Sequence, residues 1–70
     1  MYLFDFLFTL DDGIFVRIKF LGTSGEFCFT TGKRTTGAKV SELVAHEKTE
    51  ARVNEVHVLW NAQELYIVCS

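Results

Sequence analysis

The sequence predicts a single α+β domain, residues 1–70, in which a five-stranded antiparallel sheet packs on one helix in the order β-β-β-α-β-β. Three patterns predict this fold class. Large apolar residues recur at every second position within Met1–Leu21, on both sides of a short polar loop. From Val40 the apolar spacing changes to that of a helix. Two further alternating segments follow Ala51.

The first two strands are predicted as a hairpin whose loop is Asp11-Asp12-Gly13. Glycine suits the left-handed position that such a three-residue loop requires. A slip of one residue would invert every side chain, so loop and pattern together define the register. The inward pairs are Leu10 with Ile14, Phe8 with Val16, Phe6 with Ile18 and Phe4 with Phe20, and the outward pairs are Asp5 with Lys19 and Leu7 with Arg17.

The middle of the chain is predicted to contain a strand, a loop and the helix. A turn at residues 22–25 leads to a strand over Glu26–Thr31, with Phe27 and Phe29 facing inward. The segment Thr30–Lys39 is polar, basic and interrupted by glycines, which indicates a loop. The helix then buries Val40, Leu43, Val44 and Ala51 on one side, with Thr36 or Ser41 as its cap.

Two strands complete the sheet, over Val53–Trp60 and Leu65–Cys69. The strand at the N-terminus is the most aromatic and is therefore expected at the centre of the sheet. The predicted core gathers the inward-facing residues of all these elements: Phe4, Phe6, Phe8, Val16, Ile18, Phe20, Phe27, Phe29, Leu43, Val44, Val56, Val58, Trp60 and Ile67.

The predicted order of elements resembles that of the oligonucleotide/oligosaccharide-binding (OB) barrel, whose helix lies between its third and fourth strands. Small ring-forming toxin-binding subunits have the same order. This resemblance concerns architecture alone and transfers no functional residue. It implies an alternative in which the sheet curls into a small OB-like barrel.

Composition favours a protein partner over nucleic acid. Nine acidic residues outnumber seven basic ones, so nucleic-acid binding is expected to be weak or absent. The mean hydropathy of +0.18 is high for a short chain and suggests an apolar surface for a partner. Two cysteines predicted on opposite faces, Cys28 and Cys69, indicate free thiols and a cytoplasmic protein. No segment predicts a membrane span, and no cofactor is expected.

The segment Gly32-Lys33 does not meet the requirements of a phosphate-binding loop. Phe27 stands where the first glycine is needed, and Arg34 stands where the motif requires Ser or Thr. What remains is a basic loop of Lys33, Arg34 and Lys39 that offers contacts to an anion or an acidic partner, beside the simpler interpretation of a solvated loop.

No metal site and no catalytic residue is predicted. His46 and Glu50 have the one-turn spacing of zinc ligands, but the zinc-protease helix needs a second histidine and a further ligand. Cys28, His57 and Cys69 lack the close spacing of structural zinc sites, and nothing orients a Cys–His pair.

The outer face of the sheet is the predicted binding surface. It combines apolar and basic side chains, namely Leu3, Leu7, Phe15, Arg17, Lys19 and Leu21. The sequence thus predicts a small non-enzymatic module that binds a protein partner, a second copy of itself, or both. Inhibitors, adaptors and accessory proteins of phages or mobile elements have this size. The alternative is an OB-like protein that binds single-stranded nucleic acid.

Overall fold

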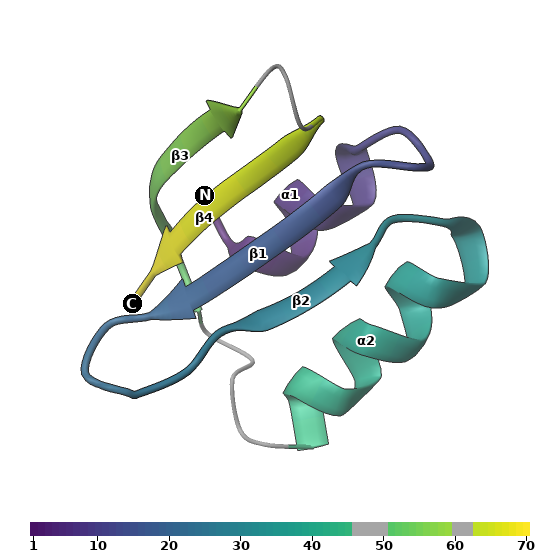
Figure 1. Cartoon of the computed structure of the whole chain (residues 1–70). Helices are drawn as coiled ribbons and strands as arrows, with labels where there is room; N and C mark the ends of the chain where they lie inside the picture. The colour runs from purple at the N-terminus through teal and green to yellow at the C-terminus, as the bar shows by residue number, and fades with distance from the viewer. Residues whose placement is uncertain (46–50, 60–62) are drawn as a thin grey trace.

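The computed structural model describes residues 1–45, 51–59 and 63–70. Its elements follow the order α-β-β-α-β-β: α1 (Leu3–Thr9), β1 (Phe15–Phe20), β2 (Phe27–Thr30), α2 (Lys33–Ala45), β3 (Val53–Leu59) and β4 (Glu64–Cys69). The four strands form an open sheet in the order β2-β1-β4-β3, in which β1 and β4 are parallel and the other pairs antiparallel (Figure 1). The predicted five-stranded antiparallel sheet and the OB-like barrel are therefore both wrong.

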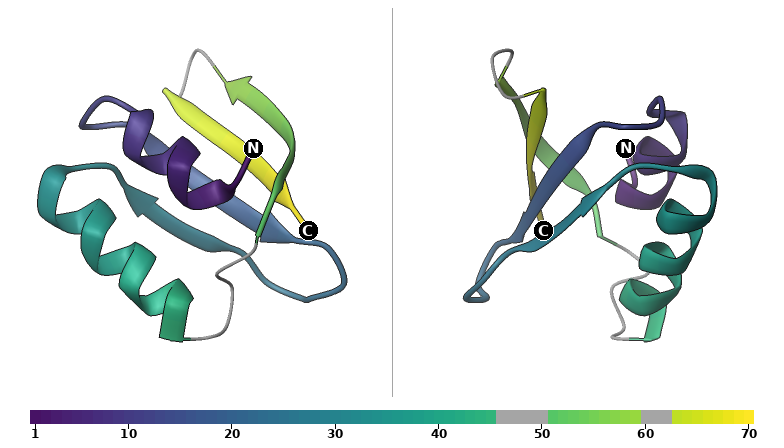
Figure 2. Two further views of the ribbon diagram at one scale, coloured as in Figure 1. Left: turned by 180° about the vertical axis from the view of Figure 1, so that it is seen from behind. Right: turned by 45° about the vertical axis from the view of Figure 1, so that its right-hand side comes forward.

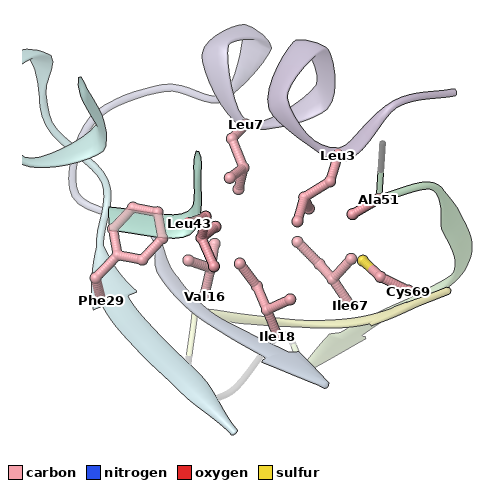
Figure 3. Packing of buried hydrophobic residues seen from close by; sticks show 9 residues of the cluster. All are labelled: Leu3, Leu7, Val16, Ile18, Phe29, Leu43, Ala51, Ile67 and Cys69. Atoms are coloured by element: carbon pink, nitrogen blue, oxygen red, sulfur yellow. The ribbon is translucent and has the colours of Figure 1, made fainter. Parts of the chain in front are cut away.

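Both helices lie on one face of this sheet, so that the molecule has two layers (Figure 2). α1 crosses the middle of the sheet, and α2 runs beside β2. The core between the layers contains Leu3 and Leu7 from α1, Leu43 from α2, and side chains from three strands (Figure 3). Val16, Ile18 and Ile67 are fully buried at its centre.

The N-terminal segment is a helix, and its prediction as a strand is wrong. Leu3 and Leu7 are one turn apart, so both point from the same side of α1 into the core, with 0% and 1% of their surface exposed. Phe8, predicted inward, is 60% exposed. Phe4 and Phe6 are half-buried and pack against the core. The predicted pairing of Asp5 with Lys19 is also wrong, since Asp5 lies in the first turn of α1.

The loop Asp11-Asp12-Gly13 is present, but it joins a helix to a strand. Gly13 has a φ of +85°, as the loop prediction requires. Thr31 holds the loop in place: its hydroxyl donates to the Asp11 carbonyl at 2.6 Å and accepts the Ile14 N–H at 2.9 Å. The same glycine thus fits a hairpin and a helix–strand connection.

The later strands agree with the sequence pattern. β1 and β2 pair with Val16 opposite Phe29 and Ile18 opposite Phe27, so the predicted orientation of both strands is confirmed. The inward orientation of Ile67 in β4 is also confirmed, and Cys69 is buried with it. Cys28 and Cys69 are free thiols, the first exposed and the second buried, as expected.

Val56 and Val58 of β3 were predicted in the core, yet 39% and 44% of their surfaces are exposed. They belong to the face that carries the helices, but β3 is the edge strand and lies beyond both helices (Figure 2). The predicted core residue Trp60 lies outside the described residues. The N-terminal segment was expected at the centre of the sheet. This is wrong, because β1 and β4 are the two central strands.

Helix α2 begins at Lys33, within the predicted loop. The Thr36 hydroxyl accepts the Gly32 N–H at 3.2 Å and so satisfies a donor at the helix start. Ser41 is not a cap, since its hydroxyl donates to Gly37 within the helix. Leu43 is buried as predicted, whereas Val44 is 45% exposed. The predicted continuation over His46–Glu50 lies outside the described residues.

Candidate functional site

The face of the sheet opposite the helices is the candidate site, and we call it the open face. Side chains alternate along a strand, so the burial of Val16 and Ile18 places Arg17 on the opposite face. The register extends this assignment to the partner strands. The open face comprises Cys28 and Thr30 of β2, Phe15, Arg17 and Lys19 of β1, Glu64, Tyr66 and Val68 of β4, and Glu55, His57 and Leu59 of β3.

A charged group lies at the centre of this face. The guanidinium of Arg17 lies between two carboxylates, with NH2 at 2.9 Å from Glu64 Oε1 and Nε at 3.6 Å from Glu26 Oε2. Glu64 is almost buried, whereas the Arg17 and Glu26 side chains are 38% and 37% exposed. Among the described residues Glu64 Oε1 makes no well-aligned hydrogen bond, so the charge of Arg17 is its main compensation. The positive charge of Arg17 is therefore largely neutralised by two carboxylates of the same molecule.

A second polar group lies toward β3. His57 Nε2 is 3.4 Å from Glu55 Oε2, two residues earlier on the same strand. The imidazole also contacts the ring of its cross-strand neighbour Tyr66 edge-on, at a centroid distance of 6.1 Å. Cys28 and His57 lie on the two outer strands, three strand spacings or about 14 Å apart, too far for a nucleophile and its base.

The apolar part of the open face lies at one end of the sheet. Phe15, Glu64 and Leu59 are neighbours across β1, β4 and β3, and Phe15 and Leu59 are 36% and 46% exposed. At the same end of the sheet, mainly on the face that carries the helices, is a shallow pocket of about 570 Å³. Its walls come from the loop before β1 and from the adjoining ends of β3 and β4: Asp11, Asp12, Gly13, Ile14, Val58, Leu59, Gln63, Glu64 and Leu65.

Three predicted partner-binding residues lie together on the open face: Phe15, Arg17 and Lys19. Leu21 follows β1 directly and is 56% exposed. The expected position of Leu3 and Leu7 on this face is wrong, because both are core residues of α1. A helix with one turn per 3.6 residues presents them to the sheet, where the predicted strand would have turned them to solvent.

The predicted basic loop is the first half of α2. Lys33 and Arg34 are exposed in its first turn. Lys39 lies further along, with its Nζ at 3.6 Å from Glu42 Oε1 and 5.8 Å from the centre of the Phe27 ring. The three basic side chains therefore belong to a helix surface and not to a flexible loop.

Comparison with protein families, with curated proteins and with solved structures gives no match to this chain. In the described ranges no group of three His, Cys, Asp or Glu side chains is arranged to hold a metal ion. Within those same ranges, neither helix has the length and apolar character needed to cross a bilayer. The arrangement of the open face is thus the main guide to function.

Sequence reasoning missed the half of the open face that β3 and β4 supply. Glu64 and Tyr66 alternate with the inward-facing Leu65 and Ile67, so the pattern itself was readable. Their position beside Arg17 depends on the parallel pairing of β1 with β4, which connects distant segments and leaves no local signal.

The buried Cys69 gives the protein a pH dependence in alkaline solution. Burial disfavours the thiolate and raises the pKa of Cys69 from 9.0 to about 11. The folded state then binds more protons than the unfolded state between these values, so the free energy of unfolding falls as pH rises from about 9 to 11. We expect this contribution to reach about 2–3 kcal/mol. In urea titrations across this pH range, the free energy of unfolding should decline more steeply for the wild type than for Cys69→Ala. Parallel declines would show that Cys69 does not cause the pH dependence.

Proposed function

We propose that this chain is a non-enzymatic protein-binding module that acts as an inhibitor, adaptor or regulatory accessory protein by covering a surface of its partner through the open face. The observation that supports the proposal is the one-sided packing of the sheet. Both helices lie on one face (Figure 2), and the other face presents exposed Phe15 and Leu59 next to paired charges. Interfaces between proteins combine apolar anchors with a polar rim in this way.

A protein surface suits this face better than a nucleic acid. Arg17, the central basic residue, is already paired with Glu26 and Glu64 and has little charge left for phosphate. The net charge of −2 also opposes attraction to a polyanion. Stacking platforms for single strands need several exposed aromatic rings together with unpaired basic residues.

The pocket at this end of the sheet suggests what the partner inserts, because a partner on the open face reaches it past Leu59 and Glu64. Its walls include Ile14, Leu59 and Leu65, and two carboxylates, Asp11 and Asp12, stand at the same pocket. A lysine or arginine of the partner fits this combination, because its aliphatic stem contacts apolar walls while its charge reaches the carboxylates. The partner surface is accordingly proposed to be basic and apolar.

Affinity capture from lysate, followed by reconstitution with the captured protein, tests this function. We expect one complex of fixed stoichiometry that survives nuclease treatment and is weakened at least tenfold by Phe15→Asp. Phe8→Asp is the matched control, since Phe8 is 60% exposed on α1, in the layer opposite the open face; it should bind as the wild type does. Capture that nuclease abolishes, or equal loss with both variants, would contradict the proposal. Far-UV circular dichroism verifies that each variant is folded.

A further inference from the structure

The outer edge of β3 is largely uncovered by the described part of the chain. β3 is the last strand of the sheet, with β4 on its inner side. On the outer side, the N-terminal segment covers only the beginning of the strand: the Leu3 N–H donates to the Ala51 carbonyl, and the Val53 N–H donates to the Met1 carbonyl, both at 2.9 Å. An edge strand of this kind presents main-chain donors and acceptors that another strand can pair with.

The side chains of β3 do not protect this edge. Every residue from Asn54 to Leu59 is exposed, including those on the face that carries the helices. Proteins commonly protect an exposed edge with lysine or proline, and β3 contains neither. A β-bulge between Val53 and Glu55 interrupts the start of the strand, which leaves Glu55–Leu59 as the regular part.

The sequence of β3 is complementary to itself in the antiparallel register centred on Val56. A twofold axis perpendicular to the sheet pairs residues of the same face, so a centre at Val56 places Val56 opposite its own copy. Glu55 then lies opposite His57 of the second copy, and His57 opposite the second Glu55. A centre at Glu55 would instead bring two carboxylates together.

We propose that this chain forms a symmetric dimer in which β3 pairs antiparallel with β3 of a second copy, centred on Val56. The two four-stranded sheets then become one continuous sheet. Two Glu55–His57 pairs flank the centre, and each imidazole keeps its contact with Tyr66. Pairing stops at Val53, whose N–H is already bonded to Met1. The inference is independent of the proposed partner surface, because it uses the strand edge and not Phe15.

Site-specific disulfide formation tests the register directly. In a Cys28→Ser background, Val56→Cys places two thiols opposite each other across the axis, with Cβ atoms about 4.5–5.5 Å apart. A small inward shift brings them to the roughly 3.5–4.5 Å of a disulfide. Val58→Cys is the matched control, since Val58 is similarly exposed on the same face. In this register the two Val58 positions are offset by about 14 Å along the strand. With oxidised glutathione, we expect a covalent dimer from Val56→Cys and little from Val58→Cys.

Charge exchange tests the same pairing in solution. His57→Glu brings carboxylates opposite each other, so sedimentation equilibrium should show a dimer dissociation constant raised at least about tenfold. The exchanged variant Glu55→His/His57→Glu restores opposite partners and should dimerise as the wild type does. A wild type that remains monomeric at millimolar concentration overturns the proposal. Equal cross-linking at positions 56 and 58, or failure of the exchanged variant to dimerise while it remains folded, also overturns it.

Discussion

Replacement of Leu7 by alanine is expected to lower the free energy of unfolding by about 2–5 kcal/mol. Leu7 is 1% exposed and points from α1 into the core above β1 (Figure 3). Its removal leaves a cavity that the surrounding side chains fill only in part. Small domains have a total stability of about 5–15 kcal/mol, so this loss is a large share of it. Urea unfolding followed by circular dichroism measures the change.

Phe8→Ala is the matched control for Leu7→Ala. Phe8 is the next residue in the same helix, and 60% of its surface is exposed. Its replacement should change the free energy of unfolding by less than about 1 kcal/mol, although phenylalanine is the larger side chain. A strand at the N-terminus would reverse the two effects, because Phe8 would then face the core and Leu7 the solvent. The pair of variants therefore distinguishes the two structures for this segment.

Replacement of Arg17 by methionine is expected to lower the free energy of unfolding by about 1–3 kcal/mol. The change leaves the nearly buried Glu64 carboxylate without the positive charge 2.9 Å away. The partial exposure of Arg17 keeps the effect below that of a fully buried pair. Thermal and urea unfolding at neutral pH both report the loss.

Two further variants establish the cause of the Arg17→Met effect. Glu26→Gln removes the more distant and more exposed carboxylate and should change stability by less than about 0.5 kcal/mol. The double variant Arg17→Met/Glu64→Gln removes both charges of the close pair and should recover most of the loss. If the double variant is as unstable as Arg17→Met alone, packing of the Arg17 side chain and not its charge stabilises the sheet.

Strand orientation was predictable from the sequence wherever one face of the strand is buried. Val16 and Ile18 alternate with Phe15 and Arg17, and the structure places the first two in the core and the others on the open face. A period of two is a local property, so it survives uncertainty about which strands are neighbours. The pairing of β1 with β4 was not predictable, because it joins segments with no local relationship.

The N-terminal segment was predicted wrongly because it satisfies two periods at once. Phe4, Phe6 and Phe8 alternate as in a strand, while Leu3 and Leu7 have the spacing of one helical face. The loop Asp11-Asp12-Gly13 is compatible with a strand or a helix before it, so it does not distinguish the two structures. The tertiary structure decides: β4 takes the place beside β1 that a hairpin partner would have occupied, and the segment covers the sheet as a helix.

The start of α2 was missed for a related reason. Threonine and glycine between residues 32 and 37 are poor helix formers, so the local preference favours a loop. Thr36 nevertheless is buried, and its hydroxyl satisfies Gly32 at the helix start. Packing and capping together outweigh the weak intrinsic preference. The basic residues of the predicted loop therefore lie in a helix.

The parallel pairing of β1 with β4 also determines when the protein can fold during its synthesis. Phe15 and its partner Glu64 are 49 positions apart, so the ribosome needs roughly 2–10 s after making β1 before β4 begins. Until then β1 has β2 on one side and an unpaired edge on the other, the side that becomes the centre of the sheet. This edge is exposed to wrong partners in the cell for those seconds. The nascent chain is therefore most vulnerable to aggregation before its last strand emerges.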